Sequence, residues 1–216
     1  MKKIFSTLLL FVLCFTTLAI PCKAHTLENM CADKITPHKA SMNLNMEERK
    51  LWIDHVLWTR NFIISDLASL EDKDAVLQRL LKNQDDIGAS IKPYYGEEAG
   101  KKLSELLREH ISIAGQVVDA AKSNNKDDLE KYNKLWYKNA DEISKFLSSA
   151  NPNWSNATLQ DMLYKHLKLT TDEVVARLNK DWKLDIESFD KGEDHMIKFA
   201  DMISDGIIKQ FPDKFK

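Results

Sequence analysis

The stretch KNQDDIGASIKPYYGEEAGKKLSELLREHISIAGQVVDA, residues Lys82–Ala120, decides the fold because a later stretch repeats it. Residues Lys138–Ala176 read KNADEISKFLSSANPNWSNATLQDMLYKHLKLTTDEVVA and align with it, 56 positions on, without a gap. The alignment superposes identical residues throughout: Lys82 and Lys138, Asn83 and Asn139, Leu103 and Leu159, Leu107 and Leu163, His110 and His166, Val118 and Val174. A constant spacing of this kind is typical of an internal duplication.

A second alignment, at a spacing of 140 positions, pairs Asp54-His55 with Asp194-His195. In this alignment the counterpart of the segment around His55 follows the second copy, whereas His55 itself precedes the first copy. We therefore predict a duplicated bundle with pseudo-twofold symmetry, in which the first and last helices fill equivalent grooves.

Apolar residues recur at steps of three and four along nearly the whole chain, and no segment alternates as a strand does. The pattern predicts a single all-α domain over residues 45–216, after a flexible lead-in over residues 25–44. Asn45 and Glu48 have the spacing of a capping box at the first helix. The predicted helices are Met46–Leu70, Ala75–Ile91, Glu97–Lys122, Asp127–Ser149, Ala157–Asn179 and Leu184–Gln210.

The first 24 residues have the features of a secretory signal peptide: a basic start, an apolar run over 4–20 and Ala24 before the expected cleavage site. We predict an exported protein, with a retained membrane anchor as the alternative. Cleavage would remove three lysines and no acidic residue, which changes the net charge from −2 to −5. An acidic mature chain disfavours nucleic acid as a partner, and Cys31 would remain without a second thiol.

Four histidines fall on apolar stripes of the predicted helices, and we expect all four imidazoles to point into the core. A single buried histidine is more often a hydrogen-bonded structural residue than a ligand. Four buried histidines related by the repeat are harder to explain as structural residues, because each buried polar group without a hydrogen-bond partner costs about 1–3 kcal/mol. These histidines are His55, His110, His166 and His195.

Inward imidazoles with nearby carboxylates are the means by which helix bundles bind metal ions. We predict His55, His110, His166 and His195 as ligands, with Asp86 and Glu142 as the carboxylates. Mixed nitrogen and oxygen ligands suit Fe, Zn or Mn, and a metal with an open position could act on oxygen, peroxide or water. Neighbouring polar residues that could orient the ligands are Asp54, Asp194, Asn83 and Asn139.

The alternative is a non-enzymatic exported module that binds another protein or the cell envelope, with histidines that only fix the helix register. Under either interpretation, we expect no stable insertion into a membrane after the signal peptide is removed. If a metal is bound, we favour one central site shared by His110 and His166 over two separate sites.

Several motifs resemble a group of small exported helical proteins of spore-forming bacteria, a resemblance that implies no particular activity. The layout is also similar, more distantly, to ferritin-like and hemerythrin-like bundles, which implies inward histidines and acids around a metal; the Glu-x-x-His motif of di-iron bundles is absent. The stretches that carry the first resemblance are Trp52–Arg60, Pro93–Gly100, Ala150–Trp154 and Gln210–Phe215.

Overall fold

The computed structural model describes residues 37–216, with side chains from residue 39 onward. In this part of the chain every regular element is a helix, which confirms the predicted all-α class. The elements are α1 (Pro37–Leu67), α2 (Lys73–Tyr95), α3 (Glu97–Lys122), α4 (Lys126–Ala150), α5 (Asn156–Leu178), α6 (Trp182–Gln210) and the short 3₁₀ helix η2 (Pro212–Phe215). The predicted signal peptide and Cys31 lie outside the described residues.

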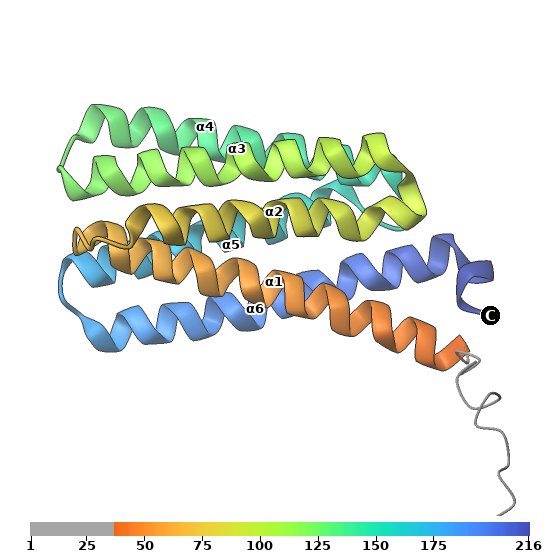
Figure 1. Cartoon of the computed structure of the whole chain (residues 1–216). Coiled ribbons are helices and arrows are strands. Elements are labelled where there is room, and N and C mark those ends of the chain that lie inside the picture. Colours follow the sequence, from red (N-terminus) through yellow and green to blue (C-terminus); the bar gives the residue numbers. More distant parts are fainter. Residues whose placement is uncertain (1–36) are drawn as a thin grey trace, which may run out of the picture. The chain divides into compact units, whose positions relative to one another are not determined.

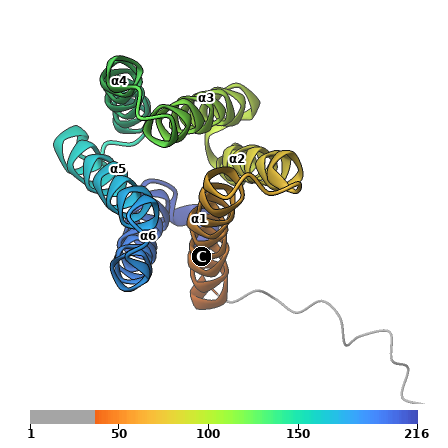
Figure 2. The same ribbon diagram turned by 90° about the vertical axis from the view of Figure 1, so that its left-hand side faces the viewer.

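The six helices form a closed ring of antiparallel neighbours (Figures 1 and 2). Each helix packs against the next one in the chain, and α6 returns to pack against α1. Helix α3 also contacts both α1 and α5, so the odd-numbered helices line the middle of the ring. Among the described helices, none has the length and apolar character needed to cross a membrane.

Helix α1 begins at Pro37, nine residues before the predicted start at Met46. The extension is stabilised by burial, because Leu44 is only 4% exposed within the main core. Asn45 is therefore not an N-cap; its amide donates to Asp201 and Ser204 on α6, both at 3.0 Å. The predicted capping box is wrong because Asn45 lies inside α1 and its side chain bonds to α6.

The other helix ends lie close to their predicted positions. Helix α3 has the predicted bounds, and the turns before α4, α5 and α6 are capped by side chains that accept a backbone N–H: Asn125, Ser155 and Asp181. Helix α2 continues through Pro93 to Tyr95, where Gly96 ends it with a φ of 86°. Such a φ favours glycine because it has no Cβ.

The turns that end α1, α3 and α5 share one geometry. In each turn a backbone N–H donates to the carbonyl five residues earlier: Leu70 to Ser65, Asn125 to Ala120, and Asp181 to Ala176. The residue before each donor has a positive φ, 53° at Ser69, 54° at Asn124 and 59° at Lys180. These are Schellman turns, and they recur at spacings of 55 and 56 residues.

The equal turns divide the bundle into three helical hairpins, α1–α2, α3–α4 and α5–α6. Core positions on the second helix of each hairpin repeat every 56 residues and are all buried: Ile87, Ile143 and Phe199 form one set, and Ile91, Leu147 and Ile203 form another. The predicted twofold order is not confirmed, because these features of the described chain recur three times.

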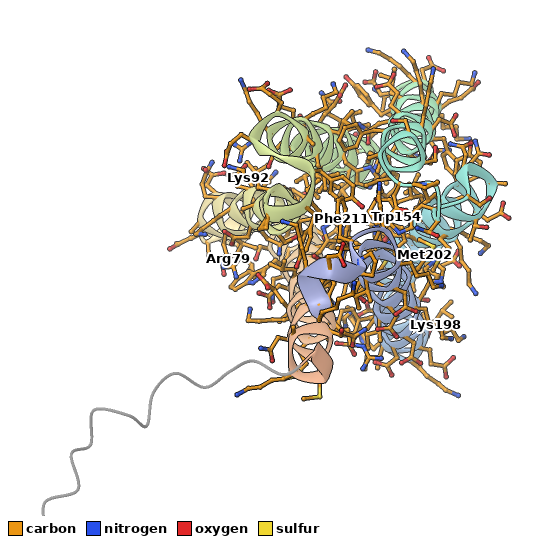
Figure 3. The ribbon with its side chains drawn as sticks, turned by 90° about the vertical axis from the view of Figure 1, so that its right-hand side faces the viewer. Arg79, Lys92, Trp154, Lys198, Met202 and Phe211 are labelled. Atoms are coloured by element: carbon orange, nitrogen blue, oxygen red, sulfur yellow. The ribbon has the colours of Figure 1, made fainter. Side chains whose placement is uncertain are left out.

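Trp154, in the connection between α4 and α5, links the α3–α4 hairpin to α6 (Figure 3). Its indole N–H donates to the carbonyl of Met202 on α6 at 3.1 Å. Gly206 makes this approach possible, since a Cβ there would lie 1.9 Å from Trp154 Nε1.

Candidate functional site

Three predicted histidines, one from the first helix of each hairpin, meet in the middle of the ring. His55 on α1, His110 on α3 and His166 on α5 are 2%, 3% and 4% exposed. The ring centroid of His166 lies 5.3 Å from that of His55 and 6.2 Å from that of His110. We call these three residues the imidazole cluster.

An equivalent hydrogen bond joins the two helices of each hairpin beside this cluster. In every case a side chain from the second helix meets the carbonyl that lies four residues before the histidine. Asn83 donates to Leu51 at 3.0 Å and Asn139 donates to Leu106 at 3.1 Å. In the third hairpin His195 Nε2 lies 2.7 Å from the Met162 carbonyl, so the fourth predicted ligand takes the place of an amide and Nε2 carries the proton.

The protonation of His110 follows from its two partners. The indole N–H of Trp136 donates to His110 Nε2 at 3.0 Å, so Nε2 is the acceptor. His110 Nδ1 lies 2.7 Å from the Asn139 side-chain oxygen, to which it donates. The ring is thus neutral, with its proton on Nδ1 and no free nitrogen.

His55 has the same tautomer for a similar reason. The Gln84 amide nitrogen donates to the Leu80 carbonyl at 2.8 Å, which leaves Gln84 Oε1 facing His55 Nδ1 at 3.2 Å. Nδ1 therefore carries the proton, and the lone pair of His55 Nε2 points at His166 Nε2, 3.4 Å away. The proton between these two nitrogens belongs to His166.

His166 is the one member of the cluster with an unsatisfied nitrogen. Its Nδ1 is buried and has no hydrogen-bond partner. His166 also lines a small cavity of about 10 Å³ that it shares with Thr59, Glu173 and Ser188. This volume is near the lower limit for one water molecule.

Burial keeps the cluster uncharged. Removal from water, together with the smaller effect of the neighbouring His110, lowers the pKa of His55 to about 3. Burial lowers the pKa of His110 to about 4. Burial and the charges of the adjacent imidazoles also hold the pKa of His166 well below its usual value. All three rings are therefore neutral over most of the acid range.

The predicted carboxylates are not part of the cluster. Asp86 and Glu142 lie at the surface, where they pair with Lys82 at 2.6 Å and Lys138 at 3.6 Å. Asp54 pairs with Lys50 at 2.6 Å on the flank of α1, and Asp194 is exposed on α6. Within residues 37–216 no three His, Cys, Asp or Glu side chains converge closely enough to hold a metal ion.

A buried ion cluster lies beyond the small cavity. Arg60 donates to Glu173 at 2.6 Å and to Asp185 at 2.9 Å, and Arg177 donates to Asp185 at 2.9 Å. Burial raises the pKa of Glu173 to about 7, although Arg60 opposes the shift. This ion cluster joins α1, α5 and α6 where the last two helices of the chain meet the first.

Sequence reasoning missed the roles of Gln84, Glu173 and Trp136. A signal for the first was present: His55 to Gln84 and His110 to Asn139 are both separated by 29 residues, as are His166 and His195. Comparison of the chain with protein-family models, curated proteins and solved structures found no match.

Proposed function

We propose that this chain is an exported helical-bundle protein that binds one transition-metal ion between His55 and His166. The observation that supports the proposal is the 3.4 Å separation of their two Nε2 atoms. Two nitrogens bound to one tetrahedral zinc ion, each at 2.0–2.1 Å, lie about 3.3 Å apart. The pair thus has the separation of one edge of a coordination tetrahedron.

The surroundings of the pair also suit a ligand role. His55 donates its other ring N–H to Gln84 Oε1 at 3.2 Å, and an outer-shell hydrogen bond of this kind orients metal-binding histidines in known sites. With Nε2 of His166 bound to a metal, its proton would move to Nδ1, which faces no partner at present. Binding would then need a change of tautomer and no net loss of a proton from the pair.

The donor set favours zinc, copper or iron over manganese. Imidazole nitrogens suit Zn, Cu and Fe, whereas Mn prefers carboxylate and water oxygens. Asp86 and Glu142, the expected oxygen ligands, pair with surface lysines instead. The remaining coordination positions would fall to water or another small molecule.

Cobalt(II), which replaces zinc and absorbs visible light, provides the test. Titration of untagged protein should give a saturable d–d band whose intensity indicates a tetrahedral site, and zinc should remove the band. The variant His55→Gln should lose the band. His195→Gln should retain it, because His195 is bonded to a carbonyl.

A pH titration separates this site from surface histidines. Because the pKa of His55 is about 3, cobalt binding should persist at pH 5, where solvent-exposed histidines are protonated. An absent band, or one that survives His55→Gln, would show that the cluster does not bind metal and has a structural role.

The second candidate is a non-enzymatic module that binds a protein or the envelope. It is favoured by apolar side chains exposed around the α5–α6 turn: Val175, Leu178, Trp182, Leu184 and Ile186. The full occupation of both His110 nitrogens also agrees with a structural role. Loss of partner capture in Trp182→Ala, with no cobalt band in the wild type, would support this function.

A further inference from the structure

A second internal space lies on the same central axis, about one helical turn from the imidazole cluster. It has a volume of about 80 Å³ and is mostly enclosed. Thr59, Ala114 and Thr170, each four residues after a histidine of the cluster, form part of its wall. Ile63, Val118 and Val174, each eight residues after, form the next layer and pack together.

The cavity follows from the threefold arrangement of the hairpins. Thr59, Ala114 and Thr170 are equivalent positions of α1, α3 and α5, and their short side chains leave a space that longer ones would fill. Phe62 and Leu80 close one side, and Trp136 closes another. The space is therefore built by many elements of the fold and does not depend on one loop.

The wall of the cavity presents only carbon atoms. Its threonine hydroxyls donate instead to carbonyls of their own helices: Thr59 to His55 at 2.7 Å, Thr170 to His166 at 3.0 Å and Thr171 to Leu167 at 2.9 Å. A water molecule needs at least two polar partners to be stable in a protein interior. This cavity supplies none, so water is disfavoured in it.

We propose that this cavity is a binding site for one small, neutral, apolar molecule, a dissolved gas or a short hydrocarbon. An engineered apolar cavity of about 150 Å³ holds benzene or xenon, and a space of half that volume suits a molecule of xenon's size. Charged or hydrogen-bonding ligands are excluded, because no group of the wall could replace their water.

The seam between α4 and α5 provides a route of entry. Val175 belongs to the cavity wall and is also 47% exposed at the surface. Leu129 of α4 is a half-buried member of the same wall. A ligand would pass between these two side chains and meet only apolar surface on its way.

Xenon is a suitable probe, and its binding is read by methyl NMR of the full chain. Increasing xenon pressure should shift the methyl signals of Val118 and Val174 along saturable curves. Ala114→Leu, which places a larger side chain in the cavity, should abolish these shifts. Ala89→Leu, on the exposed face of α2, is the matched control and should retain them.

Linear, unsaturable shifts in the wild type would overturn the proposal, and so would saturable shifts that persist in folded Ala114→Leu. Val118→Ile fills less space and serves if Ala114→Leu does not fold; it should weaken binding severalfold. The site is independent of the metal proposal. His55→Gln should keep xenon binding whether or not the wild type binds cobalt.

Discussion

The α1–α2 and α3–α4 hairpins have the same frame and differ in the buried side chains around their histidines. Both present a neutral histidine with its proton on Nδ1, and both are held by an asparagine that donates to a carbonyl. In α3–α4 the indole of Trp136 occupies the Nε2 of His110, whereas in α1–α2 the Nε2 of His55 faces His166. Glu48 of α1 also takes the place that Leu103 has in α3.

This difference shows how one scaffold yields unequal sites. The repeated hydrogen bonds fix where each imidazole stands, and a single neighbouring side chain then decides whether its second nitrogen is available. The α3–α4 hairpin is fully satisfied, whereas the α1–α2 hairpin keeps an available lone pair and an unpaired buried carboxyl.

The largest expected effect comes from breaking the frame of the satisfied hairpin. Asn139→Leu removes the acceptor of His110 Nδ1 and the donor to the Leu106 carbonyl, which leaves two buried polar groups unpaired. We expect a loss of about 3 kcal/mol in the free energy of unfolding, measured by urea denaturation.

Asn83→Leu is the counterpart in the other hairpin. It removes the donor to Leu51, but Gln84 keeps its bond to the Leu80 carbonyl. The loss should be about half as large. Equal losses in the two variants would contradict the view that the hairpins differ in how their histidines are supported.

Replacement of Glu48 should make the first hairpin more like the other two. Glu48 is fully buried and neither carboxyl oxygen makes a well-formed hydrogen bond. Burial raises its pKa from 4.5 to about 7, although the nearby Ser90 and Trp52 side chains oppose the shift. The native protein holds this proton more tightly than the unfolded chain does. The contribution of the protonated Glu48 to the free energy of unfolding is therefore fully present below pH 4.5, and it is lost as the pH rises through about 7.

Glu48→Leu removes this loss, because Leu103 and Leu159 occupy the equivalent buried positions. At pH 8 the variant should be more stable than the wild type by on the order of 3 kcal/mol, and its advantage should shrink toward pH 4.5. Urea denaturation at both pH values measures it. Glu47→Leu, at an exposed neighbour, is the control, and an advantage independent of pH would refute the assignment to the carboxyl.

Trp136→Phe should leave the His110 Nε2 atom without an indole donor, as the Nε2 atom of His55 is in the other hairpin. The indole donor to His110 Nε2 is lost while most of the ring volume remains, so we expect a loss of about 1–2 kcal/mol in urea denaturation. If the cluster binds metal, a third imidazole nitrogen becomes available, and cobalt should bind about tenfold more tightly. Unchanged or weaker cobalt binding would show that Trp136 does not control access to His110.

The smallest effects are expected at the surface carboxylates. Asp86→Ala and Glu142→Ala each break an exposed pair with a lysine four residues away, and such pairs contribute about 0.5 kcal/mol or less. Cobalt titration and thermal unfolding should both match the wild type. A large loss of cobalt binding in either variant would show that the substituted carboxylate contributes to metal binding.

Local sequence signals predicted the helices well where the ends are fixed locally. The bounds of α3 follow from Gly96 on one side and the Ser123–Asn125 turn on the other. The start of α1 could not be predicted in this way. The contacts that hold it, such as the bonds of Asn45 to Asp201 and Ser204, join residues more than 150 positions apart.

Only part of the candidate site could be predicted, because its remaining features also depend on contacts between residues far apart in the sequence. Apolar stripes correctly placed His55, His110 and His166 in the core, because burial follows helical periodicity. The same stripes could not tell an imidazole that faces another imidazole from one, like His195, that faces a carbonyl. That difference depends on which helix of a hairpin carries the residue, and it requires knowledge of the threefold arrangement.

The contact between α1 and α6 has a consequence for how the chain is made. A chain grows from its N-terminus, so α1 is complete long before α6, its neighbour in the ring but the last helix in the sequence, exists. Until residues 182–210 emerge, the apolar stripe of α1 that α6 covers remains open to water and to other unfolded chains. Release of the last helix is therefore the step that allows this stripe of α1 to be covered.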